Sequence, residues 1–108
     1  MRIISTREED VATFFLDDRF DAHEVGTFRS AVDPVVGPGA TVRLDLARVR
    51  FIDSTALAEL LRVRKALQDT GGRLVLHPLS DPVRVILELT GLDGVFGTGA
   101  GEPAGLAP

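Results

Sequence analysis

One short segment, residues 51–57, places carboxylate and hydroxyl side chains where they could take part in chemistry. Asp53, Ser54 and Thr55 are consecutive, between an apolar stretch and a leucine-rich one. Short oxygen-bearing side chains are preferred at helix starts, because they accept hydrogen bonds from free backbone amides. Two interpretations stay open here. Asp53 or Ser54 only caps a helix, or Ser54 is a hydroxyl that is modified.

Phosphorylation of Ser54 would be compatible with a helix start. A phosphate adds about −1.5 to −2 charges. The helix dipole and the unpaired amides at a helix N-terminus accommodate an anion. We therefore expect the fold to survive and the surface near Asp53 to change, so that acidic or apolar groups of a bound partner are repelled. Such a modification would switch binding rather than folding.

The remaining reactive side chains form no catalytic constellation. His23 and His77 are the two histidines, and neither has a partner at a spacing typical of a metal site or a triad. The chain has no cysteine, which excludes disulfides, cysteine nucleophiles and zinc–thiolate sites. No glycine-rich phosphate loop is present. We expect neither a cofactor nor a metal, and no enzyme.

An acidic cluster precedes the first predicted helix. Asp17, Asp18 and Asp21 could offer several oxygens to a hard cation on a tight loop. Their spacing is not that of an EF-hand, so we favour a solvated turn in which Asp21 caps the helix. A cation site is the alternative.

Local patterns predict the elements that would position Ser54. Residues 2–5 and 11–16 are strand-like and flank a polar turn, which predicts an antiparallel hairpin. A helix is expected from Ala22, because apolar residues recur at helical spacing until Pro34. Residues 41–46 alternate as a strand does, and apolar character continues to Ile52.

A second helix is expected from Asp53 to about Asp69. It has a leucine-rich face and an opposite, exposed ridge of Thr55, Ala58, Glu59 and Arg62. Residues 74–76 predict a short buried strand. A third helix begins at Ser80 and closes at Gly91. Residues 95–96 could form a last short strand. Together these elements predict an α/β fold with a small mixed sheet and helices packed on it.

The length and the charge of the chain limit which functions are possible. The 108 residues form a single domain, which we place at residues 1–97, followed by a flexible glycine-, alanine- and proline-rich tail at 98–108. The formal net charge of −4 argues against a nucleic-acid partner. The N-terminal residues do not resemble a secretory signal, and no apolar run approaches the roughly 20 residues that span a bilayer. We expect a cytoplasmic monomer without membrane insertion.

The sequence of residues 51–57, FIDSTAL, resembles the signature of STAS domains, the sulfate-transporter and anti-sigma-factor-antagonist family. Residues 19–22, 71–74 and 83–92 resemble further segments of that family in the same order. The resemblance covers residues 11–96. It implies a single-domain STAS fold, a small mixed sheet with helices on one side.

For stand-alone bacterial members, the resemblance implies an anti-sigma factor antagonist. Such a protein binds an anti-sigma factor that is also a serine kinase, is released when the kinase phosphorylates it, and is restored by a metal-dependent serine phosphatase. By position the modified residue is Ser54, with Thr55 less favoured. Asp21 and Asp53 match positions near the partner surface. We add His23 and the ridge to the expected contact residues, which are Asp21, His23, Asp53, Thr55, Ala58, Glu59 and Arg62.

The chain departs from the family pattern at two positions where glycine is usual, because Asp18 and Ala56 stand there. Two other functions stay open. One is a non-phosphorylated STAS scaffold subunit of a membrane transporter or lipid-trafficking complex. The other is a small nucleotide-binding or catalytic domain, which the absence of a phosphate loop and of paired bases disfavours.

Overall fold

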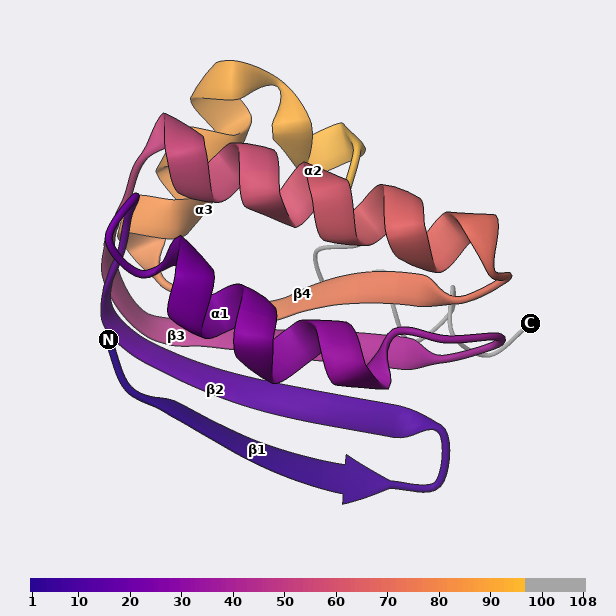
Figure 1. The fold of residues 1–108 in the computed structure, drawn as a ribbon. Coiled ribbons are helices and arrows are strands. Elements are labelled where there is room, and N and C mark those ends of the chain that lie inside the picture. Colours follow the sequence, from indigo (N-terminus) through magenta and orange to yellow (C-terminus); the bar gives the residue numbers. More distant parts are fainter. Residues whose placement is uncertain (97–108) are drawn as a thin grey trace.

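The computed structural model describes residues 1–96, and it arranges them as one four-stranded sheet with three α-helices (Figure 1). The strand order is β1-β2-β3-β4. The tail expected at 98–108 lies outside the described residues.

The first two strands form the predicted hairpin. β1 (Ile3–Glu8) pairs antiparallel with β2 (Val11–Phe20), and a two-residue turn joins them. β2 is four residues longer than the sequence indicated, since it continues beyond Leu16 through Asp17 and Asp18 to Phe20. The acidic residues stay in the strand because the next strand pairs with them, at the cost of two irregularities in the register.

Two parallel strands complete the sheet. β3 (Thr41–Ile52) lies beside β2, and β4 (Arg73–Leu79) lies beside β3. Parallel neighbours need a crossover connection. Helix α1 (Val25–Val32), extended by a 3₁₀ turn at Asp33–Val35, supplies the first crossover, and α2 (Ser54–Asp69) supplies the second.

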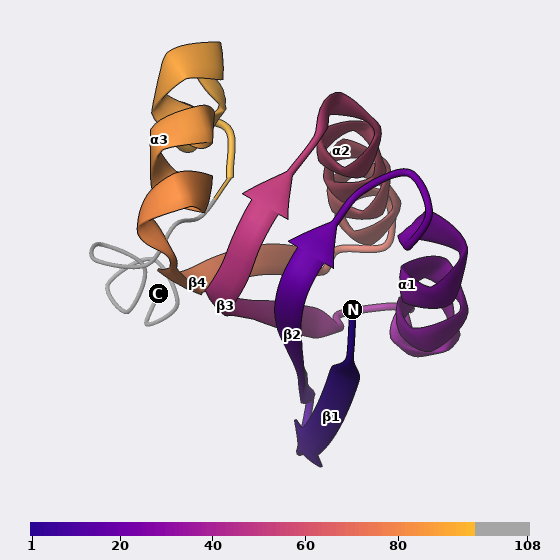
Figure 2. The same ribbon diagram turned by 90° about the vertical axis from the view of Figure 1, so that its left-hand side faces the viewer.

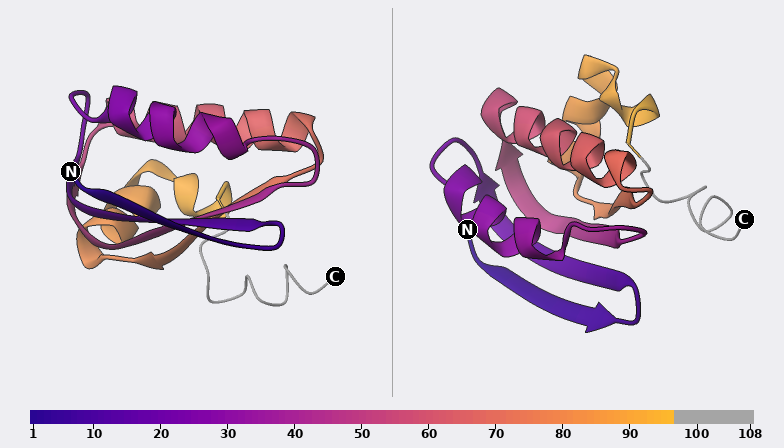
Figure 3. Two further views of the ribbon diagram at one scale, coloured as in Figure 1. Left: turned by 60° about the horizontal axis from the view of Figure 1, so that its bottom comes forward. Right: turned by 45° about the vertical axis from the view of Figure 1, so that its right-hand side comes forward.

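The helices enclose the core from two directions. α1 and α2 lie side by side over one face of the sheet (Figures 1 and 3). α3 (Asp81–Thr90) stands beyond the end of β4, and the second half of β3 rises between α2 and α3 (Figure 2). The largest fully buried side chains come from the three helices and from every strand except β1: Phe20, Phe28, Leu16, Leu44, Leu46, Leu60, Leu67, Leu76, Leu87, Val32, Val42 and Val49.

The strand expected at residues 95–96 is not formed. Residues Leu92–Gly94 form a 3₁₀ turn, and the amides of Val95 and Phe96 donate to the Leu92 carbonyl, at 3.0 and 3.2 Å. These local bonds keep the amides from a sheet partner. Phe96 is buried in the core instead. None of the helices within residues 1–96 combines the length and the apolar character that crossing a membrane requires.

A close backbone contact fixes the start of β4 against the start of β3. The Arg73 amide donates to the Ala40 carbonyl at 2.9 Å, and a Cβ atom placed on Gly72 would lie 2.2 Å from the same oxygen. A backbone oxygen at that distance cannot move aside without shifting the strand. Glycine is therefore required at position 72.

Two glycine substitutions should have opposite effects on stability. We expect Gly72→Ala to lower the free energy of unfolding by about 1–3 kcal/mol, because the added methyl group collides with the Ala40 carbonyl. The same change at Gly26, in α1 with open space around it, should raise it by up to about 1 kcal/mol through helix propensity. Urea unfolding measures both. Equal effects of the two substitutions would contradict the steric account.

Candidate partner-binding site

Ser54 is the first residue of α2, directly after the end of β3. Asp53 is the N-cap: its backbone is extended, and its carboxylate accepts a hydrogen bond from the Ala56 amide, with Oδ1 2.9 Å from that nitrogen. This settles which residue caps the helix. Because Asp53 supplies the cap, the exposed Ser54 side chain is not needed for it.

The second oxygen of the same carboxylate holds the loop that follows β2. Asp53 Oδ2 accepts a hydrogen bond from the Ala22 amide at 3.1 Å, and the Asp53 amide lies 3.4 Å from the Phe20 carbonyl oxygen to which it donates. One side chain therefore joins the start of α2 to the loop before α1. It holds the loop that carries Asp21 and His23 against the residue that precedes Ser54.

Asp21 stabilises that loop through a hydrogen bond within it. It is 9 % exposed, and its Oδ1 accepts a hydrogen bond from the His23 amide at 3.0 Å. Burial alone would raise the pKa of Asp21, but the His23 amide and the Arg19 guanidinium outweigh it and hold the pKa below the ordinary value. The expectation that Asp21 caps the first helix is wrong, because α1 begins at Val25 and Asp21 closes a turn instead. The His23 side chain is 93 % exposed, with Nδ1 3.6 Å from Asp21 Oδ1.

An exposed cation–aromatic pair, not predicted from the sequence, joins the ends of β2 and β3. The guanidinium of Arg19 lies 4.3 Å from the centre of the Phe51 ring, and Arg19 Nε is 3.3 Å from the Asp21 carboxylate. Both residues stand in the segments that carry the family resemblance. Only the register of β2 on β3, which places Arg19 opposite Phe51, shows that they meet.

The alternative of a cation site in the acidic cluster finds no support. Asp17 accepts a hydrogen bond from the Arg2 amide at 2.8 Å, and Asp18 accepts one from Arg50 Nε at 3.0 Å. Within residues 1–96, no group of three or more metal-ligating His, Asp or Glu side chains is gathered. One oxygen of each of these two carboxylates therefore already accepts a hydrogen bond from the protein.

The backbone of Asp18 accounts for the glycine usual at this position. Its φ of 66° lies in the left-handed region, which glycine adopts freely and aspartate adopts more often than most other residues. The hydrogen bond from Arg50 lowers the pKa of Asp18 and keeps it ionised. Asp18 therefore stands in a conformation that glycine would also adopt readily.

The ridge predicted on α2 is exposed only in part. Ser54 and Ala58 are exposed and Arg62 is half-buried, one helical turn apart along the same face, with Thr55 exposed beside them. Glu59 is 3 % exposed, so its assignment to the exposed ridge is wrong. The reason is α1, which packs alongside α2 and turns position 59 into the seam between the helices. A helical wheel of α2 alone does not include that neighbour.

Glu59 is the centre of an ion-pair network in this seam. Its carboxylate oxygens lie 2.7 Å from Arg29 Nη2 on α1 and 2.6 Å from Arg62 Nη2 on α2. Arg62 also contacts Asp33, at 2.7 Å. Burial tends to raise the pKa of Glu59, but the hydrogen bonds from Arg62 and Arg29 dominate and lower it. Glu59 thus aligns Arg62 and locks α1 against α2.

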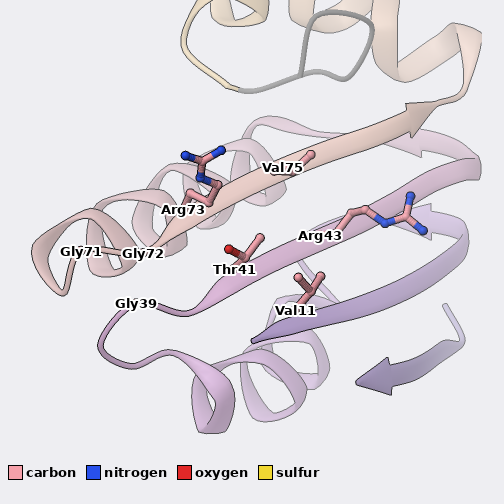
Figure 4. Close-up of a pocket in the computed structure, with 8 residues that line it drawn as sticks. All are labelled: Val11, Gly39, Thr41, Arg43, Gly71, Gly72, Arg73 and Val75. Atoms are coloured by element: carbon pink, nitrogen blue, oxygen red, sulfur yellow. The ribbon is translucent and has the colours of Figure 1, made fainter. Parts of the chain in front are cut away.

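A hollow elsewhere on the molecule lies apart from these residues. It is lined at the starts of β2, β3 and β4 by Val11, Thr41, Arg43 and Arg73, with glycines 39, 71 and 72 at its rim (Figure 4). Ser54 follows the opposite end of β3. The candidate site is therefore an open surface at the ends of β2 and β3, and this hollow forms no part of it.

The Glu59 network should make stability depend on pH. The folded protein holds the pKa of Glu59 below its ordinary value of 4.5, so the stabilisation is complete above that pH and is lost as pH falls through the folded pKa. We expect Glu59→Gln to lower the free energy of unfolding at pH 7 by about 1–3 kcal/mol, less than for a fully buried pair because both arginines reach solvent.

Urea unfolding between pH 3 and 7 tests this expectation (about the range in which carboxylates titrate). The difference between wild type and Glu59→Gln should shrink as pH falls. Glu88→Gln, an exposed change on α3, is the matched control. A constant difference across the range would mean that the ionised carboxylate contributes nothing.

Comparisons with known proteins identify the family and the fold of this chain. A family model described as the STAS domain matches residues 2–103. The anti-sigma-B factor antagonist of Listeria monocytogenes is 31% identical over 94 residues, which cover 86% of this chain and 82% of that protein.

Two solved structures share the fold. The anti-sigma factor antagonist SpoIIAA in its unphosphorylated form superposes with a TM-score of 0.77 at 23% identity, over 95% of this chain and 92% of the other. The phosphorylated form of the Bacillus cell fate determinant SpoIIAA gives 0.69 at 22% identity, over 95% and 96%. With nearly its whole length matched by the family, this chain belongs to the STAS domain family.

Proposed function

We propose that this chain is an anti-sigma factor antagonist whose binding is switched by phosphorylation of Ser54. The unmodified protein binds an anti-sigma factor that is also a serine kinase. The kinase transfers the γ-phosphoryl group of Mg-ATP to the Ser54 hydroxyl, the complex dissociates, and a metal-dependent serine phosphatase hydrolyses the phosphoester. The observation that carries this proposal is the exposed Ser54 at the first position of α2, next to an aspartate that already provides the cap.

The relatives support both halves of the proposal. The Listeria protein is named for antagonism of an anti-sigma factor, and SpoIIAA exists in phosphorylated and unphosphorylated forms. Both forms of SpoIIAA resemble this fold. This supports a modification that leaves the fold in place and acts on the surface.

The electrostatics of the site supports a switch by charge. A phosphate on Ser54 would lie at the N-terminus of α2, where the helix dipole favours an anion. It would also lie beside Asp53, which approaches the Ala22 amide, and near Asp21. Two carboxylates and a phosphate would then gather on a chain that already carries −4. A partner surface fitted to the unmodified site would meet that charge directly.

The contact face that we propose joins the loop and the exposed part of α2. It consists of Asp21, His23, Asp53 and Thr55 around Ser54, followed by Ala58 and Arg62 along the helix. Glu59 is buried and contributes to the contact face indirectly, because it holds the Arg62 side chain in position.

Ser54 variants test the switch. Incubation with the cognate anti-sigma kinase and Mg-ATP should add one phosphate to the wild-type chain, located at Ser54 by mass spectrometry. Ser54→Ala should bind the kinase and accept no phosphate. Ser54→Asp should bind roughly tenfold or more weakly, because it places charge at the interface. Calorimetry measures these affinities.

Thr55→Ala is the matched control, since it removes the neighbouring hydroxyl and should still be phosphorylated. Phosphate on the Ser54→Ala chain would refute the assignment of the site. Tight binding by Ser54→Asp would refute charge as the switch. Recovery of the chain with a membrane transporter, unphosphorylated, would favour the scaffold function.

A substitution at Ala58 tests the contact face. Ala58 is exposed one helical turn beyond Ser54, so Ala58→Arg should leave the free energy of unfolding within about 0.5 kcal/mol of wild type. The bulky charge should nevertheless weaken binding to the anti-sigma factor by about tenfold or more. Gln68→Arg, exposed near the far end of α2, should bind as wild type does. Equal affinities of the two variants would place the partner elsewhere.

A further inference from the structure

β1 is an edge strand with open backbone groups. It is the first strand in the order β1-β2-β3-β4, and it forms a border of the molecule in two perpendicular views (Figures 1 and 2). Ile4 and every residue after it in β1 are exposed. An edge of this kind can accept a further strand through its unpaired amides and carbonyls.

The hairpin geometry determines which groups face outward. A two-residue turn is closed by a hydrogen-bonded pair, here Glu8 and Val11, and such pairs alternate along an antiparallel ladder. The backbone groups of Glu8, Thr6 and Ile4 therefore face β2. Those of Ile3, Ser5 and Arg7 face outward and are available to another strand.

The two edge strands of the sheet, β1 and β4, differ in how well they are protected against pairing with a further strand. β4 contains Pro78, which lacks an amide hydrogen, and such residues block strand addition. β1 contains neither proline nor lysine, and its register with β2 runs without a bulge from Ile3 to Glu8. Of these two edges, β1 is the one suited to pairing.

The sequence of β1 is complementary to itself in one antiparallel register. Centred on Ser5, this register places Ser5 opposite Ser5 and Ile3 opposite Arg7, so that all three outward-facing residues pair. It also places Arg2 opposite Glu8 at both ends. A shift by two residues either way puts Arg2 or Glu8 opposite Thr6 or Ile4 and shortens the paired segment.

The two charged residues are available for this contact. Arg2 and Glu8 are exposed and, by strand alternation, lie on the same face of the sheet as Ile4. Within residues 1–96, neither side chain forms an ion pair. Ile4 is 51 % exposed and lies beside Phe15, which is 36 % exposed, so the same face also offers apolar surface to cover.

We propose that β1 binds β1 of a second copy of this chain, antiparallel and centred on Ser5, and joins the two sheets into one. Ion pairs between Arg2 and Glu8 close both ends of the seam. The contact is small, so the dimer is weak and forms as concentration rises. It departs from the monomer expected from the sequence. It leaves Ser54 of both copies exposed, because β2 separates β1 from β3, and it does not depend on the proposed function.

Charge-swapped variants test the pairing and its direction together. In sedimentation equilibrium, wild type should approach twice the mass of one chain as concentration rises. Arg2→Glu alone and Glu8→Arg alone should each dissociate roughly tenfold more readily, because each places like charges opposite each other at both ends. An equimolar mixture of these two variants should dimerise as wild type does, since only mixed pairs restore both ion pairs.

Two further variants control the result. Ser5→Pro removes an outward-facing amide without touching the bonds to β2, and it should abolish the dimer. Glu88→Arg makes the same charge change on α3 and should dimerise as wild type does. Circular dichroism verifies that each variant is folded. A wild type that stays monomeric at all concentrations, or a mixture that stays monomeric, would overturn the proposal.

Discussion

The Asp53 carboxylate is the interaction on which the rest of the site depends. One oxygen accepts the Ala56 amide and begins α2, and the other accepts the Ala22 amide and holds the loop that leads to α1. A serine or threonine could cap the helix, but its single oxygen would have to serve both amides. Aspartate at this position therefore fixes two segments that lie 31 residues apart. It also leaves the next residue, Ser54, without a structural task.

The seam between α1 and α2 depends on a second carboxylate. Glu59 is buried where an ionised group is unfavourable unless it is paired, and arginines from both helices pair with it. The same pairing holds the guanidinium of Arg62, which is part of the proposed contact face, between Glu59 and Asp33. The network therefore connects the internal packing of the helices to the surface that begins at Ser54.

Local chemistry explains which elements could be predicted from the sequence. Asp53 and Ser80 accept bonds from nearby amides, Gly91 ends α3 with a positive φ, and the hairpin turn joins adjacent strands. The burial of Glu59 and the Arg19–Phe51 contact were not predicted. Each depends on a neighbour about 30 residues away, which only helix packing and strand register bring close. The turn at Leu92–Gly94 was not predicted, because three residues are too few to show a helical period.

The contacts that stabilise the fold near Ser54 are made by other residues, and this favours a switch that acts at the surface. The cap of α2 is made by Asp53, the loop is held by Asp53 and Asp21, and the core is filled by apolar residues from β2, β3, β4 and the three helices. A phosphate on Ser54 would replace none of these contacts, and the helix dipole would favour its negative charge at that position. The added charge would therefore change mainly the free energy of binding to a partner at this surface, and would change the stability of the fold little. Because the helix cap and the proposed modification site are adjacent but separate residues, a charge added at Ser54 would change the binding surface while the fold stayed the same.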